Sequence, residues 1–239
     1  QASGQKEISL DGDILQWDGV GPEFRDTIGD TMYRSAQSFG GEYQYINTTG
    51  RNDIDYAKVS VWDGNLYFLA AAVDDLVLAD DEAWMNLLID YDGDPETGWE
   101  GYDFILHRSR EDGLLSVERF VNNSWEFERV GSAPYTVSGR YLTVQVPESL
   151  LGGRQNDWFD FKWTDNSTRD GNIMEYMDLG DAAPNDRFNF RFIYEKGFFG
   201  KLLDHTAGKI LFAAAVVLIL GGGIAAAVIL VRRKQRTAS

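Results

Sequence analysis

The chain has 239 residues, of which 25% are charged and 44% are hydrophobic, a composition typical of a folded protein and not of a disordered one. It contains no cysteine, which excludes disulfides, thiolate metal sites and a cysteine nucleophile. The formal net charge is −16, and four basic residues near the C-terminus leave 18 basic against 38 acidic residues before them, or −20. Such a charge argues against nucleic acid as a partner and suits neutral ligands, cations or a basic surface.

After an N-terminal arm over residues 1–6, short apolar runs alternate with turn signals from residue 7 to residue 194, without a long amphipathic helix. A tight turn at Asp63 and Gly64 joins two of these runs into a hairpin. The pattern predicts an all-β domain, an antiparallel β-sandwich of the jelly-roll kind. The predicted strands cover residues 57–62, 66–73, 84–89, 102–107, 114–121, 125–130, 141–146, 158–163 and 188–194, with one helical turn at 147–151.

Alternating carboxylates follow the third of these strands. Asp90, Asp92 and Asp94 lie two residues apart, with Glu96 and Asp103 close behind. Carboxylates in a tight turn can converge on a hard cation such as Ca²⁺, which takes six to eight oxygen ligands. The alternative is a solvated turn in which the aspartates accept hydrogen bonds from backbone N–H groups. We expect a calcium site formed by these five residues.

Aromatic residues make up 13% of the chain, and seven are tryptophan. A sugar-binding site needs flat aromatic faces together with polar groups for the hydroxyls. Trp84, Trp99 and Trp125 lie at strand ends or in loops, and we expect them to be the sugar platforms if a sugar is bound. The other tryptophans fit alternating strands and are predicted to be core.

The sequence gives little support to an enzyme. The chain has two histidines, and no nucleophile motif accompanies them. The domain is therefore predicted to be non-catalytic.

Four features stand out: an opening with Asp-Gly and then Trp, a central hairpin, an acidic loop and the closing strands. They cover residues 8–17, 61–68, 88–104, 159–166, 180–181 and 187–190. Together they resemble the family 9-type carbohydrate-binding modules of the wider DOMON-like superfamily. The resemblance implies a β-sandwich that often holds structural calcium and commonly binds sugars.

The superfamily also includes b-haem domains, usually ligated by Met with His or Lys, so the resemblance raises haem as a further alternative. Met85 and His107 lie on neighbouring predicted strands. No haem-attachment motif is present, and a lone methionine on a strand is usually a core residue, so haem is disfavoured.

Near the C-terminus, residues 210–231 contain no charged or strongly polar side chain. A helix of this length is long enough to span a bilayer. A juxtamembrane linker over 195–209 precedes this segment, and a basic tail over 232–239 follows it. The positive-inside rule then predicts a single-pass cell-membrane protein with a cytoplasmic tail and a periplasmic or extracellular domain. Because the sequence begins at Gln1 and not Met, we expect that an export signal has been removed.

The predicted membrane helix carries small residues at four-residue spacing, which allow two helix backbones to approach closely. They are Gly221, Gly222, Gly223, Ala225, Ala226 and Ala227. The sequence therefore favours a non-catalytic accessory subunit, anchored in membrane lipid, whose exported domain docks on a larger membrane protein complex. The alternative is a membrane-tethered module that binds carbohydrate, and the second alternative is a b-haem electron-transfer domain.

Overall fold

The computed structural model describes residues 5–31, 34–111 and 113–195. Thirteen strands and three 3-10 helices form within these ranges. The strands are β1 (Phe24–Arg25), β2 (Arg34–Gln37), β3 (Gln44–Asn47), β4 (Ile54–Trp62), β5 (Asn65–Ala72), β6 (Asn86–Asp90), β7 (Phe104–Glu111), β8 (Leu114–Val121), β9 (Glu126–Ser138), β10 (Tyr141–Pro147), β11 (Trp158–Asp165), β12 (Asp181–Ala183) and β13 (Phe190–Ile193). The helices are η1 (Ile14–Trp17), η2 (Glu148–Leu151) and η3 (Ile173–Met177).

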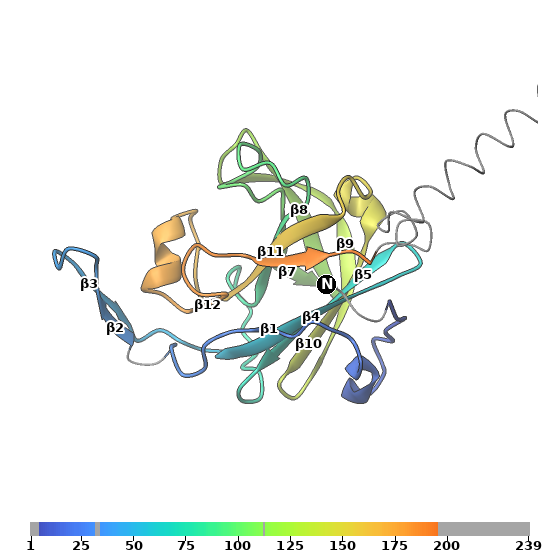
Figure 1. The fold of residues 1–239 in the computed structure, drawn as a ribbon, viewed down its shortest axis with the longest axis horizontal. Coiled ribbons are helices and arrows are strands. Elements are labelled where there is room, and N and C mark those ends of the chain that lie inside the picture. The colour runs from blue at the N-terminus through green and yellow to red at the C-terminus, as the bar shows by residue number, and fades with distance from the viewer. Residues whose placement is uncertain (1–4, 32–33, 112, 196–239) are drawn as a thin grey trace, which may run out of the picture. The chain divides into compact units, whose positions relative to one another are not determined.

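The strands pair in the order β1-β4-β5-β10-β9-β8-β7-β6-β11-β12, with β13 beside β11, and every pairing is antiparallel. The long strand β9 connects the two layers, because its first part pairs with β8 and its last residues pair with β10. A register shift in the β8–β9 pair accompanies this change of partner. The prediction of an all-β, sandwich-like domain is confirmed (Figure 1).

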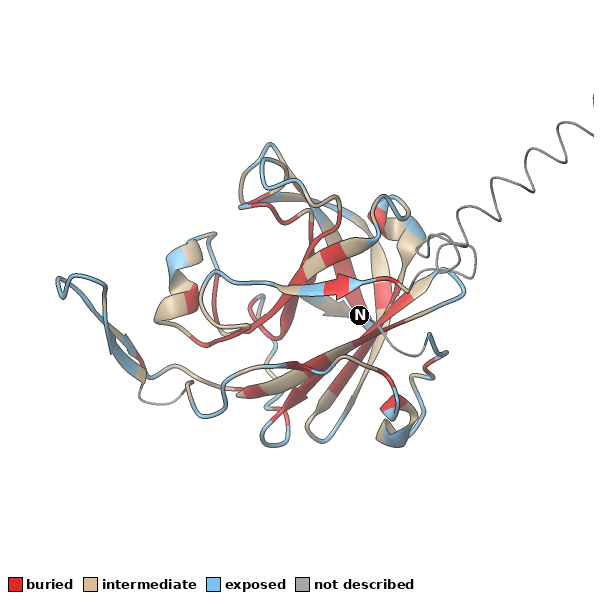
Figure 2. Cartoon of the chain, viewed as in Figure 1, coloured by how far each residue is buried: buried red, intermediate tan, exposed pale blue. Residues whose placement is uncertain are grey.

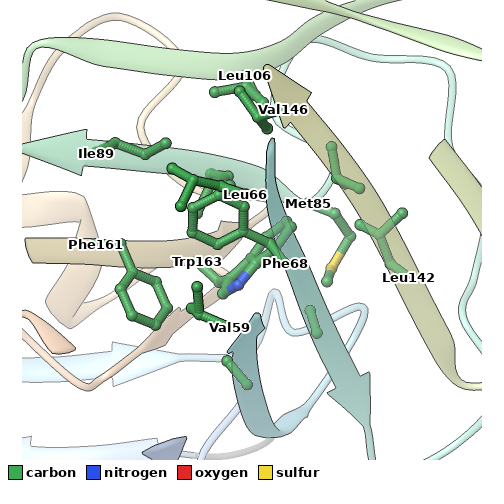
Figure 3. Packing of buried hydrophobic residues seen from close by; sticks show 14 of the residues in the cluster. Val59, Leu66, Phe68, Met85, Ile89, Leu106, Leu142, Val146, Phe161 and Trp163 are labelled. Carbon is green, nitrogen blue, oxygen red and sulfur yellow. The ribbon is translucent and has the colours of Figure 1, made fainter. Parts of the chain in front are cut away.

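Alternation along the strands fills the space between the layers. Phe68 of β5 packs against Phe159 and Phe161 of β11, with ring centroids 5.9 and 5.8 Å apart. Figure 3 shows Val59, Leu66 and Phe68 from one layer beside side chains of the other. Buried residues lie along the strands that face this core, whereas the turns are exposed (Figure 2).

A second apolar cluster covers the outer face of the β6–β7–β8–β11 layer. The loop before β7 and the helix η3 lie on this face, where Trp99 and Tyr176 pack against residues such as Leu88 of β6. The loop needs Gly98, which has φ +64°, because a Cβ there would collide with the Tyr102 carbonyl. The sandwich therefore has a main core and a smaller one outside it.

The hairpin β2–β3 stands apart as a separate two-stranded sheet. Figure 1 shows it projecting from the sandwich. At its base, Asn47 donates to the carbonyl of Gly180 at 2.6 Å, and Arg34 forms an ion pair with Asp186 at 3.0 Å. The strands predicted from sequence do not include this hairpin, because β2 contains no large apolar residue.

Candidate functional site

The acidic loop after β6 brings together three of the five predicted calcium ligands. Carboxylate oxygens of Asp90, Asp92 and Asp103 lie within 4.8 Å of one another. Asp94 and Glu96 are exposed and lie outside this group, so the structure does not gather all five residues. The Asp94 carboxylate instead accepts a hydrogen bond from the backbone N–H of Glu96 at 3.0 Å.

Hydrogen bonds from the loop backbone hold the carboxylates of this group in place. Asp103 accepts from the N–H groups of Tyr91 and Asp92, at 2.7 and 3.0 Å, and Asp90 accepts from Gly93 at 2.7 Å. Burial, opposed by the bond from Gly93 and reinforced by the charge of Asp103, raises the pKa of Asp90 to about 7. The pKa of Asp103 is raised by burial as well. Near neutral pH, the group can hold either a proton or a cation.

A second acidic cluster, absent from the predicted site residues, lies between β1 and β12. Carboxylate oxygens of Asp26, Asp30 and Asp181 lie within 4.8 Å of one another. Burial raises the pKa of Asp181, and the charges of Asp26, Asp30 and Asp53 raise it further. The segment from Asp26 to Asp30 is a short Asp-containing turn, but Asp181 is distant in the chain, so only the fold brings these residues together.

Three carboxylate oxygens of this second cluster and its neighbour Asp53 are buried without a hydrogen-bond partner among the described residues: Oδ2 of Asp26, Oδ1 of Asp30 and Oδ1 of Asp53. Burial raises the pKa of Asp26 to about 7, although the charge of Lys162 opposes this rise. Lys162 is itself buried, and its ammonium group donates to the Pro184 carbonyl. The charge of Lys162 therefore offsets only part of the cost of ionising Asp26.

A cavity of about 180 Å³ lies beside Asp53, the neighbour of the second cluster. The exposed residues Asp74 and Asp75 also line it, and so does Arg51. A cation or a basic side chain from another molecule would find several carboxylates at this opening. We refer to Asp26, Asp30, Asp53, Asp74, Asp75 and Asp181 as the acidic opening.

Two of the three predicted sugar platforms, Trp84 and Trp99, are buried, which corrects their assignment. Trp84 is fully buried in the main core, and its Nε1 donates to the Val77 carbonyl at 2.7 Å. Trp99 is 5% exposed and packs in the outer cluster against Trp125, with ring centroids 4.5 Å apart. Trp125 is half-buried, and the Arg108 guanidinium lies 5.5 Å from its ring centroid. The loop and η3 cover the outer face of the sheet, so position at a strand end does not give exposure here.

A more open aromatic surface lies where no tryptophan is found. A cleft of about 500 Å³ is lined by the β2–β3 hairpin on one side and by Met177 and Asp186 on the other. Phe39, Tyr43 and Tyr45 contribute aromatic rings to it. Arg34, Gln37 and Glu42 add polar groups to the same cleft. The sequence feature that indicates this cleft is the aromatic-rich segment of residues 39–45, which precedes β4.

The haem alternative finds no support in the geometry of its proposed ligands. Met85 lies fully buried in the main core (Figure 3). His107 is 1% exposed, its Nδ1 contacts the Trp84 carbonyl, and its ring packs edge-on against Trp84 at 4.4 Å. Burial lowers the pKa of His107 to about 3. Packed side chains thus surround both residues.

The predicted membrane helix over 210–231, with its small residues Gly221–Gly223 and Ala225–Ala227, lies outside the described residues. Within the described ranges, no helix has both the length and the apolar character needed to span a bilayer. The linker over 195–209 and the basic tail over 232–239 also lie outside those ranges, apart from Glu195.

Comparison with models of known protein families and with curated proteins finds no match to this chain. The resemblance to family 9-type carbohydrate-binding modules therefore stays an expectation from sequence motifs.

Proposed function

We propose that this protein is a non-catalytic accessory subunit, anchored in the cell membrane by residues 210–231. Its exported β-sandwich docks through its acidic surface on a basic surface of a larger membrane protein complex. The small residues of the membrane helix would pack against a helix of the same complex.

The acidic opening is the observation that carries this proposal. Three of its buried carboxylate oxygens have no partner among the described residues, and burial raises the pKa values of Asp26 and Asp53. A buried unpaired carboxylate is costly, so the opening is best satisfied by a positive group from outside. A lysine or arginine of a partner protein meets this need, and the charge of −20 before the tail would steer such a partner towards it.

Neutralising the rim of the acidic opening should weaken docking. For Asp74→Asn combined with Asp75→Asn, we expect about a fivefold loss of the complex, since two exposed charges contribute roughly 0.5 kcal/mol each. The measurement is co-purification of the full chain from its native membrane in mild detergent, at increasing salt. Because both residues are exposed, the variant should retain the melting temperature of the native protein.

A matched control is Glu126→Gln combined with Glu128→Gln on β9, which removes the same charge from exposed positions outside the opening. This control should co-purify as the native chain does. A native chain that elutes alone under the mildest extraction would contradict the proposal, as would equal losses in both double variants.

The aromatic cleft favours a second candidate function, a membrane-tethered module that binds carbohydrate. Tyr43 and Tyr45 offer ring faces, and the polar groups beside them suit sugar hydroxyls. A glycan array probed with the full chain in detergent tests this candidate. Binding that disappears in Tyr43→Ala combined with Tyr45→Ala would support it, and an array without signal would remove it.

Calcium is proposed to bind the carboxylates of Asp90, Asp92 and Asp103. At the acidic opening, calcium would compete with the basic side chain of a partner protein. The donor set fits a hard cation, because all of its ligand atoms are carboxylate oxygens. Bound calcium would neutralise groups whose pKa values are raised by burial, and it would then stabilise the loops that carry them.

A further inference from the structure

The β2–β3 hairpin has two open edges. Its strands pair with one another, with Arg34 opposite Asn47 and Gln37 opposite Gln44, and among the described residues neither strand has a second neighbour. An isolated two-stranded sheet is marginally stable in water, and an unpaired edge offers a row of N–H and C=O groups to another strand. The hairpin is therefore built to accept a further strand.

Charged residues and proline, which often protect an edge, are missing from β3. From Tyr43 to Gly50 the sequence contains no charged residue and no proline. Large apolar side chains on and beside this strand are exposed to solvent, with Tyr43 at 68% and Ile46 at 57%. The side chains of β2 are smaller or more polar. β3 is thus the edge that favours pairing.

Electrostatics selects the occupant of this edge. The chain before the tail carries −20, so two copies repel one another over most of their surface. Residues 34–50 are an exception, because Arg34 and Glu42 are their only charged residues and the net charge is zero. The hairpin also projects from the sandwich (Figure 1), so two hairpins can meet while the acidic domains stay apart.

We propose that β3 pairs antiparallel with β3 of a second copy of this chain. The two hairpins then form one four-stranded sheet across a twofold axis, in the order β2–β3–β3–β2. In a twofold contact of this kind the same segment of both copies meets, so the segment must not repel its own copy. The segment over 43–47 meets this need, because it is neutral and its residues favour β-structure. The pairing uses the edge of the hairpin, not the acidic opening, and it does not depend on docking to a larger complex.

A lysine on the exposed edge tests the pairing directly. Ile46→Lys places two positive charges against each other near the axis, and lysine is a common edge-protecting residue. We expect the dimer dissociation constant of the full chain in detergent to rise by about tenfold or more, measured by sedimentation velocity. Phe188→Lys is the control, since Phe188 is 73% exposed and lies outside the hairpin, and this variant should dimerise as the native chain does.

Because the chain contains no cysteine, single introduced thiols report the contact without background. Gln44→Cys, Tyr45→Cys and Ile46→Cys scan the strand, and only residues near the twofold axis face their own copies within disulfide reach. We expect one of the three to form a disulfide-linked dimer under mild oxidation, well above Glu128→Cys on β9.

Three results would overturn the proposal. The first is a native chain that stays monomeric at high micromolar concentration. The second is a dimer that Ile46→Lys leaves unchanged, which would assign the contact to another surface such as the membrane helix. The third is equal cross-linking at the three hairpin positions and at Glu128→Cys. Loss of co-purification with a larger complex would leave all three measurements unaffected.

Discussion

Replacing Arg51 by alanine is expected to lower the free energy of unfolding by about 3–5 kcal/mol, the largest effect that we expect from a single substitution. Arg51 donates from Nε and Nη2 to the two carboxylate oxygens of Asp165, at 2.9 and 2.7 Å, and from Nη1 to Asp81 at 2.6 Å. Asp165 is completely buried on β11. Without the guanidinium, its charge would stay in the core without an ionic partner.

Asp165 also organises three separate parts of the chain, so the loss of its ionic partner affects more than one contact. It accepts hydrogen bonds from the backbone N–H groups of Asn52 and Met85, at 3.2 and 3.0 Å. These contacts join the start of β4 and the start of β6 to β11. The site is therefore a cross-link between the layers as well as an ion pair.

Chemical denaturation of the full chain measures the effect. Arg51→Lys should give an intermediate loss, because lysine keeps the charge and cannot reproduce the two-pronged contact. Arg25→Ala removes an exposed arginine paired with Glu23, and it should change stability by less than about 0.5 kcal/mol. Similar values for Arg51→Ala and Arg25→Ala would show that the buried pair does not stabilise the fold.

Calcium should reverse a loss of stability at alkaline pH. In chelator, we expect the melting temperature to fall between about pH 4 and pH 7, and to be roughly 5 °C lower at pH 8 than at pH 5. Added calcium should recover most of this difference at pH 8 and have little effect at pH 5. Differential scanning fluorimetry of the full chain, with and without chelator, provides the measurement.

The direction follows from the raised pKa values. Asp26 and Asp90 each have a pKa of about 7 in the folded protein against 3.8 as the ordinary value, and burial is the main cause in both. Between pH 3.8, the ordinary pKa, and about pH 7, the folded pKa, the folded state binds more protons than the unfolded state. The free energy of unfolding therefore decreases as pH rises through this range. Above pH 7 both states are ionised, and the loss is complete unless a cation replaces the proton.

Single variants separate the two acidic sites. Asp90→Asn and Asp26→Asn remove one titrating carboxylate each, and each should flatten the pH dependence in chelator. The variant that also loses the calcium response marks the site that binds the ion. Identical melting temperatures in calcium and chelator at pH 8 would refute binding at both sites, and a rise in stability from pH 5 to pH 8 would contradict the burial argument.

The strands that the sequence predicted best are those with strong alternation next to a clear turn. β8 has the bounds expected from its pattern, β4 ends at Trp62 as expected but begins earlier, at Ile54, and β5 is displaced by one residue. β2 and β12 were missed because they are short and carry no alternating large side chains. Such strands form because their neighbours supply the hydrogen bonds, not because their own residues favour them.

In the candidate site, too, features set by residues close in the chain were predictable, whereas features set by distant segments were not. Asp90, Asp92 and Asp103 are close in the chain, so a local pattern was enough to predict that their carboxylates meet. The surface positions expected for Trp84 and Trp99 are wrong, because a strand-end position says nothing about what covers it. The core position expected for Trp62 is also wrong, since this residue is 45% exposed. Trp99 is buried by segments from η3 and β8 that lie far away in the sequence.

By itself the sequence determined the all-β class, the strongly acidic charge, the absence of thiol chemistry and the acidic loop, because each of these depends on composition or on neighbours in the chain. Only the tertiary structure decided that Asp26, Asp30 and Asp181 converge, that Trp84 and Trp99 are covered and that the β2–β3 hairpin stands free. Those features depend on which distant segments pack together. That outcome is set by the summed burial and hydrogen bonding of the whole domain, which no local pattern contains.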